Sequence, residues 1–345
     1  MRLGLTYNLR PEIAPNPADP IDRYEEFDSE ETVTAIAASL RRLGHHVERL
    51  GFGPAMLDAL THRASGDRLD GVFNFAEGIG GRGRESQVPA MLEMLGIPNT
   101  GSDPVALALA LDKGLAKVFA ASHGIATAPF IIVGPDDPLG AVDLRYPLFA
   151  KPVAEGSSMG IRNNSVCRSH PELLALVATL QRSYHQPVLI EEFLPGDEYT
   201  VGVLGNGVGA EVVGVMQVQP RRHERDFVYS LEVKRDYLNQ VDYRMSDELL
   251  ASGAVSPATL ATIRPLALDA HRAFACRDLS RVDIRCDRNG APNFIEINPL
   301  PGLNPIHSDL VLLARGHAWD YDQLIARIVD VASERWSQRA STFNF

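Results

Sequence analysis

The sequence predicts an α/β protein whose first part holds a parallel sheet and whose C-terminal parts are α+β. Residues 1–100 alternate strand-like apolar runs with amphipathic helical runs, the pattern of a parallel sheet covered by helices. Residues 198–218 and 279–298 hold strand-like runs separated only by short turns, which indicates antiparallel pairing. These observations predict several structural units.

Composition is that of an ordinary globular protein with room for two or three such units. Of the 345 residues, 45% are hydrophobic and 22% are charged. The formal net charge of −11 argues against binding to nucleic acid or to an anionic membrane surface. Cys167, Cys276 and Cys286 form no C-x-x-C pair, which fits a reducing compartment. The sequence shows no signal peptide and no membrane span, so we expect a soluble cytoplasmic protein.

The first predicted unit covers residues 1–103. We expect strands at LGLTYNL, HHVERLGF and LDGVFNFAEG, and a helix at VPAMLEMLG. Another helix is expected to open at the segment DSEE, which begins at Asp28 and resembles a capping signal, and to end at Gly44. Residues 9–27 hold four prolines and many acids, so we expect a long ordered loop or lid there.

Residues 104–194 form the second predicted unit and residues 195–345 the third. The second unit begins with one continuous helix, ALALALDKGLAKVFAASHG, and has another helix over 171–184. Its strands are expected at FIIVG, YPLFAKP, GIRNNSV and PVLIEEF. In the third unit we expect strands at EYTVGVLG and AEVVGVMQV, then the charged segment RRHERDFVYSLEVKRDY, a helix over 257–276, a hairpin, and a helical tail after about residue 317.

The hairpin is predicted in RVDIRCDRNGAPNFIEIN. Asn289-Gly290 is a strong signal for a two-residue turn, because both turn positions need positive φ. Folding the chain there places Asp283 opposite Glu296. One face then carries Arg281, Asp283, Arg285, Glu296 and Asn298, and the core face carries Val282, Ile284, Ile295 and Ile297.

This register predicts a metal site. Asp283 and Glu296 would lie roughly 5 Å apart at Cβ, where two carboxylates repel each other. A divalent cation removes the repulsion, and such oxygen ligands suit Mg²⁺, which commonly takes one or two carboxylates plus substrate phosphates. The alternative is a surface ladder of ion pairs in which Arg281 and Arg285 neutralise the two acids.

A second candidate site is FAKPVAEGSSMG, residues 149–160. Lys151 ends a strand, and the small residues after it would let backbone N–H groups approach a phosphate. The segment lacks the P-loop pattern but matches G-x-S-x-G around Ser158, so a serine hydrolase using Asp283 and His307 is an alternative. A nucleophile elbow runs directly into a helix, whereas GIRNNSV reads as a strand. A flexible loop without function is the third interpretation.

Three further segments carry weaker signals. GIGGRG, residues 78–83, matches G-x-G-x-x-G, but acidic Glu77 stands beside it, which disfavours a dinucleotide. In LIEEFLPGDEY, Glu191 and Glu198 could accept hydrogen bonds from a ribose or an amine, and residues 192–194 could pair with an adenine edge through their backbone. Lys234 in SLEVKRDY could reach a γ-phosphate. A solvated strand end or loop is the alternative for each.

Taken in order, these motifs resemble the ATP-grasp ligases of the D-alanine–D-alanine ligase family. The resemblance rests on NTGSDPVALALALDKGLAK, FAKPVAEGSSMGI, LIEEFLPGDEYTVGVLG, SLEVK and RVDIRCDRNGAPNFIEINPLPGLNP, and covers roughly residues 70–315. It implies an ATP-grasp fold, in which two subdomains hold ATP between them.

The resemblance also implies roles for individual residues. The implied ATP-binding set is Lys113, Lys151, Glu155, Gly156, Ser157, Ser158, Glu191, Glu192, Phe193, Leu194, Glu198 and Lys234. The implied ligands of Mg²⁺, with Mn²⁺ possible, are Asp283, Glu296 and Asn298. The implied catalytic set is Arg281, Ser157, Gly302 and Lys234, and the implied substrate-binding set is Glu77, Arg281, Gly302, His307 and Ser308.

The implied reaction is ATP-dependent ligation of a carboxylate to an amine through an acylphosphate. Arg281 and the backbone N–H of Gly302 would stabilise the tetrahedral oxyanion. The 225–240 segment would close over the site and exclude water. The implied partners are small amino acids or peptides, and a homodimer is suggested.

This sequence departs from the family pattern near the substrates. The N-terminal Gly-Gly-x-Ser-x-Glu stretch is replaced by EEFDSEET, so Glu26, Glu30 or Glu31 would hold the first amino group. Glu77 stands where the family has a histidine, and Arg235 where it has a tyrosine. D-alanyl-D-alanine formation for the cell wall, ligation of other amino acids or peptide-like acids, and nucleotide binding without ligation therefore all stay open.

Overall fold

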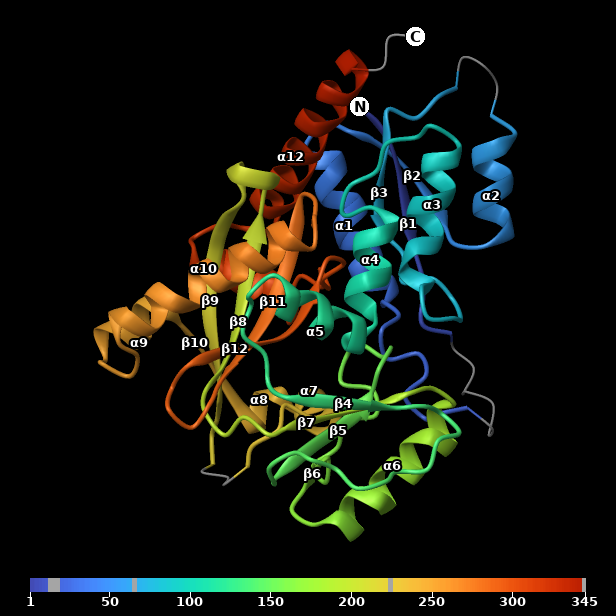
Figure 1. Cartoon of the computed structure of the whole chain (residues 1–345). Coiled ribbons are helices and arrows are strands. Elements are labelled where there is room, and N and C mark those ends of the chain that lie inside the picture. Colours follow the sequence, from blue (N-terminus) through green and yellow to red (C-terminus); the bar gives the residue numbers. More distant parts are fainter. Residues whose placement is uncertain (12–18, 64–66, 223–225, 343–345) are drawn as a thin grey trace.

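The computed structural model describes residues 1–11, 19–63, 67–222 and 226–342 (Figure 1). Seven residues of the predicted 9–27 lid, residues 12–18, lie outside this part. Three sheets organise the chain. In Figure 1 the first lies at the upper right, the second at the bottom beside helix α6, and the third at the left.

The first sheet is parallel, as predicted. Strands β1 (Arg2–Tyr7), β2 (His46–Gly51) and β3 (Gly71–Phe75) lie in the order β2-β1-β3. Helix α1 (Glu30–Arg42) begins after Ser29, whose side chain accepts from the Thr32 backbone N–H, so the N-cap is Ser29. Helix α3 (Gln87–Met94) follows a 3₁₀ turn, η1 (Arg84–Ser86), and helix α2 (Pro54–Thr61) was not predicted.

The second sheet has the order β4-β7-β5-β6 and is antiparallel. Its strands are β4 (Phe130–Val133), β5 (Leu148–Pro152), β6 (Val166–Cys167) and β7 (Val188–Glu192), with α6 (His170–Tyr184) packed on it. The predicted strand GIRNNSV was wrong. Turns at 160 and at 163–164 interrupt the segment, and of its residues only Val166 pairs, as part of β6. Gly160 has a φ of 74° and its N–H donates to Asp22 Oδ2, which turns the chain away from the sheet.

The predicted continuous helix ALALALDKGLAKVFAASHG was also wrong. It is broken into α4 (Pro104–Leu111) and α5 (Lys113–Ser122) at Asp112. Asp112 has an extended ψ of 97°, and its side chain accepts from the Leu115 N–H as the N-cap of α5. The break makes Lys113 the first residue of a new helix.

The third sheet is antiparallel with the order β10-β9-β8-β11-β12. Its strands are β8 (Glu198–Leu204), β9 (Glu211–Pro220), β10 (Val241–Met245), β11 (Leu279–Cys286) and β12 (Pro292–Asn298), with a 3₁₀ turn η2 (Gly207–Gly209) between β8 and β9. The predicted helix over 257–276 is present as α10 (Pro257–Ala273), which packs on this sheet. The short helices α7 (Leu231–Arg235), α8 (Tyr237–Gln240) and α9 (Ser246–Ala251) and helix α11 (Asp309–Gly316) were not predicted.

The hairpin keeps the predicted pairing at its acidic end. Asp283 faces Glu296 and Arg281 faces Asn298, as expected. The turn, however, is one residue longer than predicted, because Asp287 N–H donates to the Ala291 carbonyl at 2.8 Å.

A β-bulge compensates for the longer turn. The register shifts after Asp283, so Ile284 pairs with Phe294 and Ile295 is the extra residue. Phe294 is therefore fully buried in the core in the place predicted for Ile295, which instead lines a cavity. Of the turn residues, Gly290 has positive φ (81°) and Asn289 does not, which corrects the predicted two-residue turn.

The tail helix α12 (Tyr321–Thr342) returns to the first sheet. It packs against α1, and Leu324, Ile325 and Ile328 join the core that α1 and β1 build.

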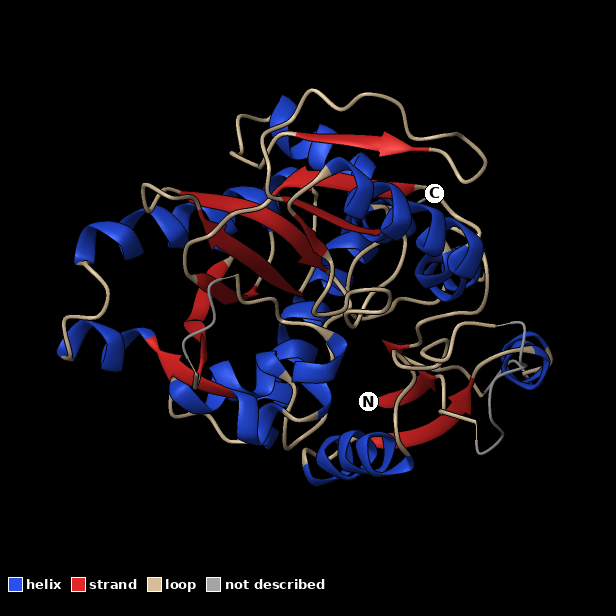
Figure 2. Ribbon diagram, turned by 90° about the horizontal axis from the view of Figure 1, so that it is seen from below, coloured by secondary structure: helices blue, strands red, loops and turns tan. Residues whose placement is uncertain are grey.

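The strands near the N-terminus form a group apart from the other strands (Figure 2). The unit boundaries at 103/104 and 194/195 stay predictions. In the described part of the chain, no helix combines the length and apolar character needed to cross a membrane.

Candidate active site

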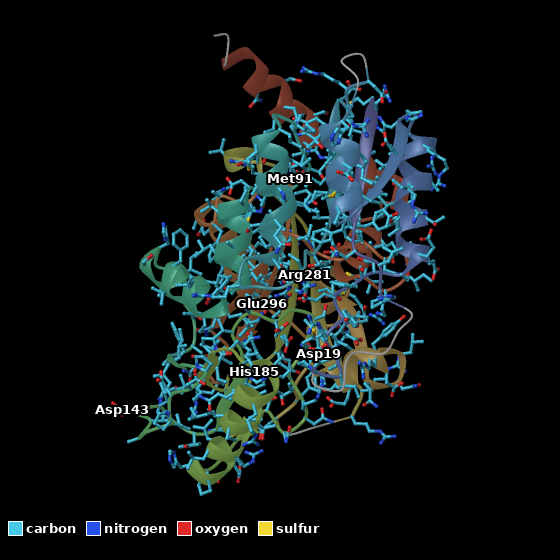
Figure 3. All side chains as sticks on the ribbon, turned by 90° about the vertical axis from the view of Figure 1, so that its right-hand side faces the viewer. Asp19, Met91, Asp143, His185, Arg281 and Glu296 are labelled. Carbon is cyan, nitrogen blue, oxygen red and sulfur yellow. The ribbon has the colours of Figure 1, made fainter. Side chains whose placement is uncertain are left out.

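Polar side chains of the β11–β12 hairpin converge on one face. Arg281 donates to Asp283 at 3.1 Å from Nε and 2.8 Å from Nη2. Asn298 Nδ2 lies 3.4 Å from Asp283 Oδ2 and 3.4 Å from Glu296 Oε1, and Thr200 of β8 donates to Asp283 Oδ1 at 3.1 Å. Arg281 and Glu296 lie near the middle of the molecule (Figure 3). Four of the five hairpin residues predicted for this face do meet, and the fifth, Arg285, pairs with Glu198.

The two carboxyl groups of this face have pKa shifts of opposite sign. Burial and the nearby charge of Glu296 raise the pKa of Asp283. Burial acts in the same direction on Glu296, but the charges of Lys113, Lys151 and Arg281 outweigh it and hold the pKa of Glu296 well below its usual range. Two carboxylates with an amide between them form an oxygen-rich set, and rotation of the Asn298 amide exchanges its nitrogen for its oxygen. This set fits Mg²⁺.

Lys113 reaches the acidic pair from the start of α5. Its Nζ lies 3.2 Å from Glu296 Oε2 and donates to the Glu155 carbonyl at 2.5 Å. Its backbone N–H donates to the Val153 carbonyl at 3.0 Å, which anchors α5 to the end of β5. The helix break at Asp112 is what aims this lysine at the site.

Lys151 belongs to a buried chain of three charges. Glu191 lies 3.0 Å from Lys151 Nζ and 2.7 Å from Lys117 Nζ, and all three side chains are at most 5% exposed. Burial would raise the pKa of Glu191, but the two lysines lower it to about 2. Glu191 is therefore ionised and holds Lys151, which differs from the hydrogen-bond acceptor for ribose or amine suggested by the sequence. Lys117 was not predicted as part of the site.

Eight of the twelve residues predicted to bind ATP line a cavity of about 90 Å³ between the second and third sheets. Lys113, Gly156 and Ser157 line the adjoining cavity instead, and Glu155 lines neither. Arg285 lies 4.7 Å from the Phe193 ring centroid, and its Nη1 donates to Glu198 at 2.9 Å. Burial raises the pKa of Glu198. The Glu192 side chain instead pairs with exposed Arg145 at 2.9 Å, so only its backbone is available to a ligand. The predicted members of this lining are Lys151, Ser158, Glu191, Glu192, Phe193, Leu194, Glu198 and Lys234.

The glycine-serine loop has an unusual backbone. Ser157 and Ser158 both have positive φ, 46° and 58°, which costs about 1–3 kcal/mol each for a residue other than glycine. Ser158 Oγ donates to the Tyr229 carbonyl at 2.9 Å. His307 lies beside Tyr237, 6.2 Å between ring centroids, and the loop leads into turns, not a helix. These features do not build a serine-hydrolase triad.

A larger cavity of about 480 Å³ adjoins the first. Both are lined by Tyr229, Lys234, Arg281, Glu296 and Asp309, so these five residues mark where they meet. Asp309, which lies 3.4 Å from Arg281 Nη1, was not predicted. The predicted residues in the larger cavity are Glu77, Lys113, Gly156, Ser157, Lys234, Arg281, Glu296, Asn298, Gly302, His307 and Ser308.

The segment before α1 covers this cavity with acids. Glu26 accepts from Arg84 Nη2 at 2.5 Å and from Nε at 3.2 Å. Glu30 instead pairs with Arg49 at 2.5 Å and Glu31 is exposed, and neither lines the cavity. Of the three glutamates predicted for the amino group, Glu26 is the one that lines the cavity within the described residues. Arg84 was not predicted, because no local pattern joins residues this far apart in sequence.

Helix α7 carries the predicted closing lysine. Lys234 Nζ lies 5.1 Å from the Tyr229 ring centroid. Burial and the charge of Arg281 lower the pKa of Lys234. The next residue, Arg235, pairs with Glu25 at 2.7 Å, which ties α7 to the N-terminal segment.

The chain after β12 approaches the site closely. A Cβ at Gly302 would lie 2.9 Å from Ser308 Oγ, so a larger residue would displace that side chain. Ser308 Oγ accepts from the Asn304 N–H at 2.8 Å, and Asn304 Nδ2 donates to Thr32 of α1 at 2.9 Å. These contacts fix the loop that bears Gly302 and His307 against the first unit.

Comparisons with known proteins agree with this geometry. Residues 119–330 match the family model described as D-ala D-ala ligase C-terminus, which is more than half of the chain. A D-alanine–D-alanine ligase of Alcanivorax borkumensis is 32% identical over 301 residues, 87% of this chain and 88% of the relative. An uncharacterised protein of Sinorhizobium fredii, y4sG, is 34% identical over 329 residues, 93% of this chain and 91% of the relative.

A solved structure shares the fold. The crystal structure of Bacillus anthracis D-alanine–D-alanine ligase complexed with ATP has a TM-score of 0.73 at 20% identity and covers 98% of this chain and 99% of its own. The expected ATP-grasp fold is thereby confirmed.

Proposed function

The chain belongs to the D-alanine–D-alanine ligase family, and from this premise we propose that it is an ATP-dependent ligase that joins a carboxylate to an amine. One observation carries the proposal. Lys113 and Arg281 converge on Glu296, where the smaller cavity, lined by predicted nucleotide-binding residues, meets the larger cavity. Cations gathered at that point can neutralise a phosphoryl group in transfer.

We place the adenine end of ATP in the smaller cavity and its phosphates where the two cavities meet. Phe149 and Phe193 offer apolar faces, and Glu198 can accept from ribose hydroxyls. Lys151, fixed by Glu191, and Lys113 extend toward the phosphates. The backbone of the glycine-serine loop, residues 155–158, can cover them.

The residues that would hold Mg²⁺ are Asp283, Glu296 and Asn298. When bound, the ion supplies charge neutralisation and orientation of the phosphate oxygens. Arg281 stays in contact with Asp283, so the site keeps a guanidinium beside the metal ligands for the oxyanion that forms later.

The chemistry then has two steps. A carboxylate oxygen of the first substrate attacks the γ-phosphorus, and the bond to the bridging oxygen breaks so that ADP leaves with the electron pair. The amine nitrogen of the second substrate, as the neutral amine, attacks the acyl carbon, and its proton leaves with the phosphate as HPO₄²⁻. The tetrahedral intermediate, stabilised by Arg281 and the Gly302 N–H, collapses when phosphate leaves with the C–O electron pair.

An acylphosphate needs protection from water. The Arg235–Glu25 and Arg84–Glu26 ion pairs hold α7 and the N-terminal segment over the larger cavity. Breaking them would open the cavity for substrate entry and product release.

D-alanyl-D-alanine is one candidate product, and the relatives named D-alanine–D-alanine ligase support it. A different amino-acid pair is the second candidate, favoured by the Arg235–Glu25 pair and by Glu77, which change the chemistry of the substrate cavity. A homodimer also stays a proposal.

Phosphate release from Mg-ATP, with mass spectrometry of the products, tests the proposal. The purified protein is incubated with D-alanine, the L-amino acids and simple dipeptides. Release that depends on an acid and an amine, with a ligated mass, supports the ligase. A D-Ala-D-Ala mass selects the first candidate, another ligated mass selects the second, and ATP binding without ligation across the panel contradicts the proposal.

A further inference from the structure

Three carboxylates meet at one wall of the larger cavity. Glu26, Glu77 and Glu85 each offer an oxygen, and these oxygens all lie within 4.8 Å of one another. All three residues line the cavity. Of the three, Glu26 alone has an ion-pair partner within the described residues, the guanidinium of Arg84. One ammonium group would need only one of these acids, so the cluster offers more carboxyl groups than a simple amino acid requires.

The environment of the Glu85 side chain is the second observation that points to a ligand. The residue is 9% exposed and its side chain borders the cavity, and in the described chain that side chain has neither a hydrogen bond nor an ion pair. A carboxylate this buried is costly to leave without a partner. Burial and the charge of Glu26 raise the pKa of Glu85 to about 8, and burial with the same neighbour raises that of Glu77. A cation placed among the three acids would reverse this repulsion.

The cluster lies beside the reaction centre. The charges of Lys113 and Glu296 both act on Glu85, so the acids border the place where the carboxylate would be phosphorylated. Glu26 is fixed against the glycine-serine loop, because a Cβ at Gly156 would lie 2.0 Å from its Oε1. The acids therefore face the first substrate, whose carboxylate must reach the phosphates.

We propose that Glu26, Glu77 and Glu85 recognise an additional cationic group on the first substrate, which makes that substrate a diamino acid or another basic amino acid. The inference rests on the proposed ligase function and names its substrate class. Fully ionised, the three acids beside Arg84 retain two negative charges, which an α-ammonium and a side-chain cation would balance. The cavity, at about 480 Å³, has room for such a side chain.

A resident divalent metal fits the cluster less well. The Arg84 guanidinium already donates twice to Glu26 Oε2, which leaves a metal ion fewer free carboxylate oxygens. A metal would also leave the large cavity unfilled, whereas an ammonium group has three donors for three acceptors.

Calorimetric binding tests the proposal without requiring turnover. The full-length protein is saturated with Mg²⁺ and the β,γ-methylene analogue of ATP, and titrated with ornithine and lysine, each as both enantiomers. Norvaline and norleucine serve as neutral controls of similar length. At least one cationic ligand should bind at least about tenfold more tightly than its neutral counterpart.

Variants assign the effect to the cluster. Glu85→Gln and Glu77→Gln keep the side-chain volume and remove charge, so either should abolish most of the preference for a cation. Two variants are used so that a folding defect in one leaves the other decisive. Glu211→Gln, on β9 and paired with exposed Arg327 at 3.1 Å, is the matched control and should leave the preference unchanged.

Equal binding of cationic and neutral ligands overturns the inference, and so does a preference that survives both cluster variants. Stoichiometric Ca²⁺ or Mn²⁺ binding that both variants abolish, with no cationic preference, assigns the acids to a metal instead. Ligation is scored separately. A cation-selective protein that forms no ligated product contradicts the proposed ligase but not the recognition, whereas ligation of neutral acids without selectivity contradicts only the recognition.

Discussion

Glu191→Gln is the perturbation whose effect follows most closely from the structure. Glu191 is the common partner of Lys117 and Lys151, and the two lysines are 0% and 3% exposed. The substitution keeps the shape of the side chain but leaves two buried ammonium groups without a counter-charge. Removing one member of a buried ion pair costs about 3–5 kcal/mol.

The pKa of Glu191 gives an independent magnitude. Its fall from 4.5 to about 2 corresponds to about 3 kcal/mol of stability, at 1.36 kcal/mol per unit. Because the folded-state pKa is lowered, this contribution is present above pH 4.5 and is lost as the pH falls toward 2. Both routes give a loss of about 3 kcal/mol at neutral pH for the variant.

Urea unfolding at pH 7 measures this loss. Glu192→Gln is the matched control, because its partner Arg145 is 77% exposed and such pairs contribute less than about 1 kcal/mol. The gap between wild type and Glu191→Gln should narrow as the pH falls below about 4.5. A loss below about 1 kcal/mol, or a gap independent of pH, would refute the buried charge chain.

Three further outcomes are expected. Glu296→Gln should lower phosphate release at least about 100-fold while circular dichroism stays that of the folded protein, and wild-type turnover would remove Glu296 from the site. Gly160→Ala should lower the free energy of unfolding in urea by more than about 2 kcal/mol, because φ at Gly160 is 74° and a Cβ there would lie 2.4 Å from a proline side chain. The control Gly253→Ala, at a position with φ of 70° and open space, should lower it by only about 1 kcal/mol. Equal losses in the two variants would contradict the contact at Gly160. Arg235→Tyr should not by itself create strong ligase activity with D-alanine, because the acidic residues of the cavity remain. A large gain in D-Ala-D-Ala formation would show that these acids have little effect on the choice of substrate.

The sequence predicted the acidic face of the hairpin because strand alternation is a local property. The register at Asp283 and Glu296 followed from the position of the turn, yet it held for a reason the sequence did not show. The turn is one residue longer than its two-residue signal suggests, and the bulge at Ile295 restores the register. Bulges depend on packing across the sheet, here the burial of Phe294, which local patterns do not reveal.

At the helix break at Asp112, by contrast, the sequence carried a local signal that the prediction missed. The apolar run before it and the periodic residues after it both favour helix, so one helix was predicted. Asp112, a residue type that commonly caps helix N-termini, followed by Lys113 and Gly114, was the signal that a second helix begins there. Close packing also requires Gly114, since a Cβ there would lie 2.4 Å from Ile132.

Contacts between distant segments could not be read from the sequence. Arg84 joins Glu26 across 58 residues, and Lys117 reaches Glu191 across a sheet edge. Each side chain alone is an ordinary surface charge until the units pack together. The chemistry of the substrate wall therefore became visible only in three dimensions, whereas the nucleotide motifs could be found in order along the chain.

Transfer of labelled oxygen is the measurement that decides whether this chain is a ligase with an acylphosphate intermediate. The accepted acid substrate is labelled with ¹⁸O in its carboxylate and incubated with Mg-ATP and the amine, and the released phosphate is analysed by mass spectrometry. Attack of the carboxylate on the γ-phosphorus predicts one ¹⁸O atom in each phosphate and one in the ligated product. Phosphate without ¹⁸O would mean that water, not the carboxylate, receives the phosphoryl group, which would contradict the proposed function.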